Sequence, residues 1–276
     1  MGEEEDRDQP RPFPTPPEAR YSRSLERGLA ILACFTPERP VLGIAELAER
    51  LGMSRPTTHR YVSTLASLGY LEQDASRKYR LALGTIDLGA ALNAMGLCKH
   101  ARPHLEELAQ RSGNTAQIAV LDGPEILLVE DVRSRGTRGN KPPESVRAGS
   151  RLPAYCTSMG KVLLAYLPSG LSEKLISEME LLARGPRTIT SKTALRAQLE
   201  DVRHEQLALE DEELLEGSCT IAAPVREESG DVIAAVGLAA YRGVVEAEEL
   251  VERYEGAVLA TAERISRQLG WRWEGG

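Results

Sequence analysis

Apolar residues in the first third of the chain recur every three or four positions in three separate stretches, which is the period of an amphipathic helix. Ser24 and Ser54 stand at the start of the outer two stretches, where a hydroxyl can cap a helix N-terminus. Gly52 follows the middle stretch, at a place where helices often end in a left-handed residue. The pattern therefore predicts three helices, over residues 24–35, 44–51 and 54–68.

The apolar spacing also predicts which faces of these helices point inward. The inward-facing residues are Leu25, Leu29, Leu32 and Phe35 in the first helix and Tyr61, Val62, Leu65 and Leu68 in the third. Two short β-forming runs, 70–73 and 77–81, then flank a turn-prone tripeptide and predict a hairpin. Its tip carries Arg77 and Lys78. Three helices with a tight turn between the last two, followed by a hairpin, form a winged helix-turn-helix.

The rest of the chain alternates helical and β patterns. A linker helix over 83–98 leads from the winged helix-turn-helix domain, 20–82, into a second domain, 99–271. We expect helices in the second domain near 100–112, 157–167, 171–182, 194–206 and 246–269, and strands at 116–121, 126–132, 220–226 and 231–239. Short apolar β-runs joined by turn residues favour antiparallel hairpins, so the predicted fold class is α+β, with helices packed on a sheet.

Composition divides the chain into a tail and two domains. Its 276 residues favour two domains, and its net charge is −7. Residues 1–19 hold six acidic and two basic side chains and five prolines, which predicts a disordered tail. Residues 20–86 hold ten basic and six acidic side chains, whereas residues 87–276 hold 22 basic and 29 acidic ones. A basic segment between two acidic segments indicates a polyanionic partner for that segment.

The third helix is the candidate DNA-reading element, because an α-helix fits the major groove and arginine can donate two hydrogen bonds to guanine. The basic hairpin tip lies where a wing would meet the minor groove or the phosphate backbone. The candidate contacts to double-stranded DNA are the polar and basic residues of both elements and one proline: Ser54, Arg55, Pro56, Thr57, Thr58, His59, Arg60, Ser63, Arg77 and Lys78. The alternative is a winged helix that binds another protein and no DNA.

Other classes of function leave little trace in the sequence. There is no phosphate-binding loop, dinucleotide fingerprint or GxSxG motif, and Cys156 has no histidine near it in sequence to activate its thiol. Cys98, His100 and His104 lack the further ligand that a metal site needs. We therefore expect no enzymatic activity, metal or cofactor. Four scattered cysteines, a chain start without a secretory pattern and the lack of an 18-residue apolar run favour a cytoplasmic protein with no membrane partner.

Longer motifs occur in both domains. In the first they are SLERGLAILACF (24–35), IAELAERLGMSRPTTHRYVSTLASLGYLE (44–72) and KYRLALGTIDLG (78–89). In the second they are ARPHLEELAQRSGNTAQIAVLDGPEILLVE (101–130), RLPAYCTSMGKVLLAYLP (151–168), RTIT (187–190) and TIAAPV (220–225). Together they resemble, in order and over nearly the whole chain, the IclR family of bacterial transcription regulators. The start, YSRSLERGLAIL (21–32), is similar to the branch that controls aromatic-acid catabolism through protocatechuate and 4-hydroxybenzoate.

The resemblance implies a GAF-like C-terminal domain that binds a small organic-acid effector and tunes operator binding by a homodimer or dimer of dimers. Carried over by position, the effector site falls on Ser158, Met159, Glu210, Thr220, Gly237 and Ala239. Ser158 and Met159 begin a helix whose N–H groups can hold a carboxylate. Glu210 stands where the family usually has Asp, and Thr220 where many relatives have Cys.

Gly237 and Ala239 stand where relatives that bind small keto acids present serine hydroxyls. Loss of two hydroxyls removes polar contacts and adds volume, which favours an aromatic acid over glyoxylate or pyruvate. A keto acid bound by the same fold is the alternative effector, and close packing of a strand against a helix is the alternative reason for the two small residues. The predicted function is thus a bacterial DNA-binding regulator of a catabolic operon that responds to a small organic acid.

Overall fold

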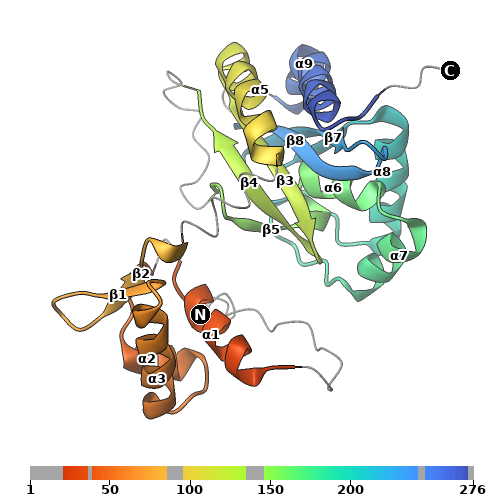
Figure 1. Cartoon of the computed structure of the whole chain (residues 1–276). Helices are drawn as coiled ribbons and strands as arrows, with labels where there is room; N and C mark the ends of the chain where they lie inside the picture. The colour runs from red at the N-terminus through yellow and green to blue at the C-terminus, as the bar shows by residue number, and fades with distance from the viewer. Residues whose placement is uncertain (1–20, 37–38, 86–95, 135–145, 242–245, 273–276) are drawn as a thin grey trace. The chain divides into compact units, whose positions relative to one another are not determined.

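A computed structural model of the chain describes residues 21–36, 39–85, 96–134, 146–241 and 246–272 (Figure 1). These residues form two compact units, one within residues 1–94 and one within residues 95–276. The predicted tail, 1–19, and residues 86–95 of the predicted linker helix lie outside the described residues. None of the helices in the described ranges is long and apolar enough to cross a membrane.

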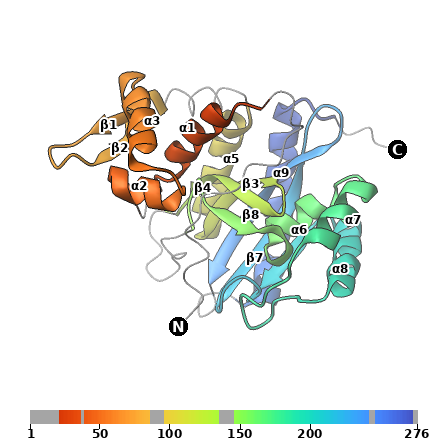
Figure 2. The same cartoon turned by 90° about the horizontal axis from the view of Figure 1, so that it is seen from below.

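The first unit is a winged helix-turn-helix, as the apolar pattern predicts. Its helices are α1 (Arg23–Ala33), α2 (Ile44–Arg50) and α3 (Arg55–Ser67), and its wing is the antiparallel pair β1 (Leu71–Gln73) and β2 (Tyr79–Leu81). Helix α3 packs against α1, α2 and β1 (Figure 2). Every element contributes to the core of this unit, which includes the buried residues Ile31, Leu47, Val62, Leu71 and Tyr79.

Adjoining local signals make the tight turn between α2 and α3. Gly52 has a φ of +58°, which glycine adopts without the steric cost of a Cβ. The hydroxyl of Ser54 accepts the N–H of Thr57 at 3.3 Å and so caps α3. Pro56 lies in the first turn of α3, where its missing N–H would have no acceptor in the helix. These positions agree with the sequence prediction.

Three finer predictions for the first unit are wrong. Ser22 caps α1, since its hydroxyl accepts the N–H of Leu25 at 3.4 Å, and Ser24 lies inside the helix. Leu25 and Leu29 are exposed, because only the C-terminal half of α1 reaches the core. Leu68 is 63% exposed, because it follows the last turn of α3.

The second unit is built on a six-stranded antiparallel sheet in the order β5-β4-β3-β8-β7-β6. Its strands are β3 (Thr115–Asp122), β4 (Glu125–Val132), β5 (Arg151–Pro153), β6 (Ala208–Asp211), β7 (Ser218–Arg226) and β8 (Val232–Tyr241). The apolar pattern does not predict β5 and β6, because strands of three and four residues are too short to show a clear alternation. With the helices of this unit, the sheet confirms the α+β class.

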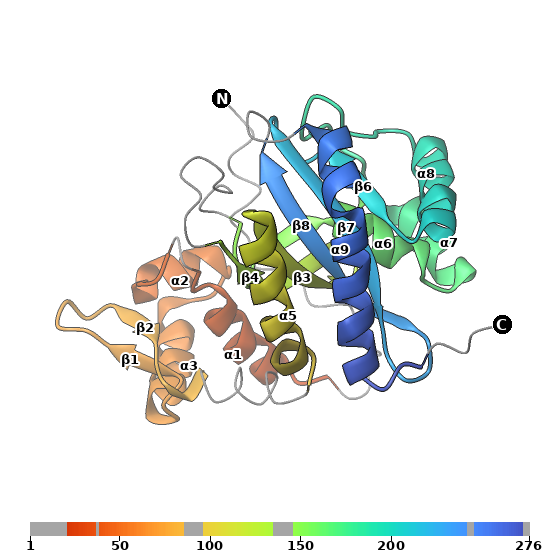
Figure 3. The same ribbon diagram turned by 90° about the horizontal axis from the view of Figure 1, so that it is seen from above.

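Helices cover both faces of this sheet (Figures 1 and 3). One face carries α5 (Leu97–Ser112) and α9 (Ala247–Gln268), which lie side by side. The other carries the 3-10 turn η3 (Ala154–Cys156) and the helices α6 (Ser158–Ala165), α7 (Ser169–Glu178) and α8 (Lys192–Glu205). All five helices correspond to predicted ones, although α7 ends at Glu178, before the predicted residue 182.

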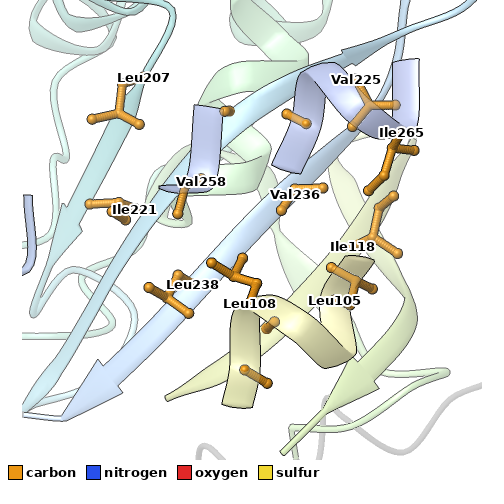
Figure 4. Close-up of a cluster of buried hydrophobic side chains, with 14 of the residues drawn as sticks. Leu105, Leu108, Ile118, Leu207, Ile221, Val225, Val236, Leu238, Val258 and Ile265 are labelled. Carbon is orange, nitrogen blue, oxygen red and sulfur yellow. The ribbon is translucent and has the colours of Figure 1, made fainter. Parts of the chain in front are cut away.

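Alternate side chains of the central strands serve the two faces of the sheet. One set packs against α5 and α9 in a cluster that includes Leu105, Leu108, Ile118, Leu207, Ile221, Val225, Val236, Leu238, Val258 and Ile265 (Figure 4). The residues between them along β7 and β8, among them Thr220, Gly237 and Ala239, therefore face α6. The alternation of side chains along β7 and β8 thus places Thr220, Gly237 and Ala239, the predicted effector residues of these strands, on the face toward α6.

Close packing of α6 on η3 requires a glycine. A Cβ at Gly160 would overlap the carbonyl oxygen of Ala154, which is backbone and cannot rotate away. We expect Gly160→Ala to lower the free energy of unfolding by about 3 kcal/mol or more, measured by urea denaturation. Gly256→Ala is the matched control, because Gly256 lies inside α9 with open space around it and alanine should stabilise that helix by about 1 kcal/mol. Equal stabilities of the two variants would contradict the close contact.

Candidate functional site

The predicted DNA contacts lie on the outer face of α3 and at the wing tip, with one exception. Those exposed are Ser54, Arg55, Pro56, His59, Arg60, Arg77 and Lys78, and Thr57 and Ser63 are half-buried. Thr58 is fully buried, and its hydroxyl donates to the carbonyl oxygen of Ser54 at 3.1 Å. Thr58 therefore packs α3 onto the core, and its burial argues against a contact between this side chain and DNA.

Two arginines and the lack of acidic residues make the outer face of α3 positive. Arg55 is the first residue of the helix, which contains no Asp or Glu. The guanidinium carbon of Arg60 lies 5.7 Å from the centre of the Tyr61 ring, so the aromatic ring supports the arginine stem. The Nδ1 atom of His59 lies 3.4 Å from the hydroxyl oxygen of Ser63, one turn along the helix. This face offers hydrogen-bond donors to a polyanion and has no carboxylate to oppose it.

Hydrogen bonds to Asp74 shape the wing tip. Its carboxylate accepts the hydroxyl of Ser76 at 2.7 Å and the N–H groups of Ser76 and Lys78 at 2.9 Å, and these bonds lower the pKa of Asp74. Arg77 at the tip has a φ of +62° and is exposed. The Nζ atom of Lys78 lies 3.6 Å from the carboxylate of Glu46. Arg77 is therefore the better placed of the two tip cations for a phosphate.

Three of the predicted effector residues lie in one row across the second sheet. Glu210 on β6 pairs with Thr220 on β7, and Thr220 pairs with Ala239 on β8. The row continues to Thr115 on β3, and Gly237 lies in the neighbouring row. Since alternation turns these positions toward α6, strand register brings together residues that are distant in sequence.

A chain of hydrogen bonds links the start of α6 to this row. The Ser158 Oγ atom lies 2.7 Å from Thr220 Oγ1, which lies 3.1 Å from Glu210 Oε2. The other carboxylate oxygen of Glu210 accepts the backbone N–H groups of Glu213 and Leu214 at 2.8 Å and 3.1 Å. Burial raises the pKa of Glu210, and the donors around its carboxylate oppose that shift. The predicted residues Ser158, Thr220 and Glu210 thus form one connected polar group.

A buried ion pair holds the loop that follows β6. Lys161 is fully buried in α6, where it pairs with Glu213 and donates to the carbonyl oxygen of Leu209 at 3.2 Å. Burial lowers the pKa of Lys161 and raises that of Glu213, and the attraction between the two charges opposes both shifts. Because the N–H of Glu213 also donates to Glu210, this pair fixes the position of the Glu210 carboxylate.

The side chain of Met159 occupies the space next to Gly237. A Cβ at position 237 would lie 2.9 Å from the Sδ atom and 3.0 Å from the Cγ atom of Met159. Met159 and Ala239 are themselves buried, at 3% and 5% exposure. The sequence predicts extra volume for a ligand at Gly237, where relatives have a serine hydroxyl. The Met159 side chain fills that volume.

Sequence reasoning missed several buried polar residues around the site. Lys161 and Glu213 form the ion pair, and Gln117 lies in the row of Gly237, where it donates to the carboxylate of Asp131 at 2.9 Å. The position of Lys161 inside an otherwise apolar helical stretch could have indicated a buried lysine. Glu213 gave no such signal, because an acidic stretch ordinarily indicates a solvated loop.

The buried cysteine at this site does not carry nucleophilic chemistry. Burial, followed by the charges of Glu210 and Glu213, raises the pKa of the Cys156 thiol to about 12, so the thiol is protonated at neutral pH. Nowhere in the described ranges do three His, Cys, Asp or Glu side chains gather closely enough to hold a metal ion.

Family models match both units. The model described as "IclR helix-turn-helix domain" matches residues 24–75, and "Bacterial transcriptional regulator IclR C-terminal" matches residues 89–267. The Pca regulon regulatory protein of Pseudomonas putida is 33% identical over 90% of this chain and 84% of its own length. The HTH-type transcriptional regulator KdgR of Escherichia coli is 33% identical over 90% of this chain and 93% of its own length.

A solved structure is similar over the same extent. It is an IclR homolog from Microbacterium hydrocarbonoxydans complexed with 4-hydroxybenzoate. Its TM-score is 0.79 at 27% identity, with 89% of this chain and 98% of that chain covered. The proteins of Pseudomonas putida and Escherichia coli are both named as regulators.

The contact between Met159 and Gly237 predicts a coupled effect on stability. We expect Gly237→Ala to lower the free energy of unfolding by about 1–3 kcal/mol, because the new methyl group overpacks against the thioether. Adding Met159→Ala should relieve that clash, so the double variant should lose less than the sum of the two single losses in urea denaturation. Additive losses would show that the Gly237→Ala loss does not arise from contact with Met159.

Proposed function

The chain belongs to the IclR family of bacterial transcriptional regulators, and from this premise we propose that it controls a catabolic operon in response to an aromatic acid. As a member of that family it is a regulator with a DNA-binding helix-turn-helix domain and an effector domain. The observation that supports an acid effector is the hydrogen-bonded chain from Ser158 through Thr220 to Glu210. This chain joins predicted effector residues from three separate elements.

We assign operator recognition to the outer face of α3 and to the wing. Arg55 and Arg60 are exposed on a helix without carboxylates, and guanidinium groups can donate in pairs to guanine. Arg77 is exposed at a tip whose backbone Asp74 holds in place, which suits a phosphate contact. A homodimer or dimer of dimers would present two or more such faces to an operator with repeated half-sites.

We assign the acid to the start of α6 and the polar row beneath it. The first N–H groups of a helix have no acceptor within the helix. In α6 the N–H of Gly160 donates to the hydroxyl of Thr157 at 3.2 Å. The N–H groups of Ser158 and Met159 are then the donors for a carboxylate, in line with the helix dipole. Met159 and the aliphatic side chains nearby supply an apolar wall for a ring. The aromatic assignment is also supported by the relatives named for the Pca regulon and solved with 4-hydroxybenzoate.

A small keto acid is the second candidate effector. The observation that favours it is the thioether of Met159 against Gly237, which leaves less room than two small residues alone would provide. A methionine side chain is flexible, however, and can turn aside to admit a ring. The choice between the two acids therefore depends on whether Met159 moves when the effector binds.

The DNA proposal predicts different losses for different arginines. Arg55→Ala or Arg60→Ala should weaken specific operator binding by about 1–3 kcal/mol and relax the preference at one operator position. Arg77→Ala should weaken binding to all sequences alike and reduce the salt slope by about one unit. Arg196→Ala, at a half-buried arginine of α8 that pairs with Glu173, is the control and should leave binding unchanged. Mobility shifts and footprints check these results, and footprints should show half-sites about one helical turn apart. Wild-type binding by the α3 variants would exclude α3 as the reading helix.

The effector proposal predicts a selective gain in stability. In the full-length protein, 4-hydroxybenzoate should raise the melting temperature by mass action and change operator affinity, whereas glyoxylate or pyruvate should do so much less. Thr220→Val should remove most of the shift, because it breaks the polar chain at its centre. Glu205→Gln, at an exposed carboxyl of α8, should not. A melting-temperature shift with pyruvate alone would favour the keto-acid alternative.

A further inference from the structure

The hydroxyls of Thr220 and Ser158, between Glu210 and the start of α6, can donate along this chain in two opposite directions. Each hydroxyl has one hydrogen to donate, and the contacts are 2.7 Å from Ser158 to Thr220 and 3.1 Å from Thr220 to Glu210. When the Glu210 carboxylate is ionised, Thr220 donates to it and Ser158 donates to Thr220. When Glu210 carries a proton on Oε2, it donates to Thr220, and Thr220 donates to Ser158.

The two orientations present opposite ends to a ligand at the start of α6. In the ionised state the hydrogen of Ser158 is used, and its oxygen offers only lone pairs, which repel an acid's carboxylate. In the protonated state the hydrogen of Ser158 is free to donate to that carboxylate. The proton on Glu210 therefore decides whether Ser158 opposes or assists an anionic ligand.

The charges around Glu210 also disfavour a second anion. Glu213 and Lys161 neutralise one another as a buried pair, which leaves the Glu210 carboxylate, 1% exposed, without a cation of its own in that pair. The other titratable or charged groups near it are Asp211 and Glu212, which both pair with Arg187, the thiol of Cys156, on which Arg184 also acts, the thiol of Cys219, and Tyr241 at the end of β8. Burial of an acid beside an ionised Glu210 would place two like charges in a region of low dielectric.

We propose that binding of an acid at the start of α6 is coupled to uptake of one proton by Glu210, through reversal of the Thr220 and Ser158 hydroxyls; this rests on the proposed effector site. The proton comes from solvent and binds Oε2, because Oε1 already accepts the N–H groups of Glu213 and Leu214 and the Ser218 hydroxyl. The two hydroxyl hydrogens rotate, and no covalent bond between heavy atoms forms or breaks. The site then holds one negative charge, that of the acid, in place of the one that Glu210 gives up.

The coupling sets the pH dependence of affinity. Burial already raises the pKa of Glu210 above its usual range, and a bound anion raises it further. Below the pKa of the free site Glu210 is protonated in both states, so affinity does not change with pH. As pH rises between the pKa of the free site and that of the bound site, Kd should rise about tenfold per pH unit. Above the second pKa it should level off.

Calorimetry in two buffers measures the proton directly. We would titrate 4-hydroxybenzoate into the full-length protein between pH 5 and 8, at each pH in two buffers that hold that pH and differ in ionisation enthalpy, such as phosphate and imidazole near neutrality. The observed enthalpy should differ between the buffers by the amount that corresponds to about one proton taken up per acid in the window where Kd rises. Binding with no buffer dependence at any pH in this range would overturn the coupling and leave the effector site standing.

Variants of the relay separate this effect from a general loss of structure. Glu210→Gln should bind the acid with no proton uptake and a Kd independent of pH, because the amide donates permanently to Thr220. Glu205→Gln, an exposed carboxyl outside the relay, should take up protons as the wild-type protein does. Proton uptake that persists in Glu210→Gln would overturn the assignment to Glu210, and the wild-type buffer comparison decides the coupling even if that variant does not fold. Should 4-hydroxybenzoate give no heat, pyruvate replaces it, since its carboxylate makes the same demand; no heat with either acid would overturn the acid site together with the coupling.

Discussion

The buried ion pair between Lys161 and Glu213 is the contact on which the arrangement of the proposed effector site depends. Removing two charges from water costs several kcal/mol for each ion, and only close pairing with additional hydrogen bonds offsets that cost. The pair joins α6 to the loop after β6, and the same loop donates two N–H groups to Glu210. One contact thus sets both the position of the helix start and the position of the carboxylate beneath it.

The two parts of the chain carry net charges of opposite sign. The N-terminal segment that holds α3 is basic, which draws it to DNA, whereas the segment that holds the sheet is acidic overall. An acidic surface does not attract a free organic acid at long range, and screening by salt limits its reach to about 10 Å. In the proposed effector site, recognition of an acid would therefore rest on local donors and on the charge state of Glu210. The polar row under α6 provides this local chemistry within a region of low dielectric.

Several details could not be read from apolar spacing alone. The exposed positions of Leu25 and Leu29 depend on how far α1 extends past the core, and periodicity does not contain that length. Thr58 belongs by type to the polar face of α3, but its hydroxyl bonds to the carbonyl oxygen of Ser54 and turns inward. A helical period assigns a face to within about one position in a turn, so residues at the border of two faces are the ones misplaced.

The sequence by itself determined the order of most elements, the Ser54 cap of α3, the turn before that helix, and its basic face. Periodicity, caps and turn residues act over a few positions, so their effects are legible locally. Only the tertiary structure decided how the predicted effector residues lie together, since strand register aligns Glu210, Thr220 and Ala239 in one row. It also decided that Met159 fills the space beside Gly237 and that Lys161 finds a buried partner. These outcomes depend on contacts between segments far apart in the chain, and residue type alone does not specify such contacts.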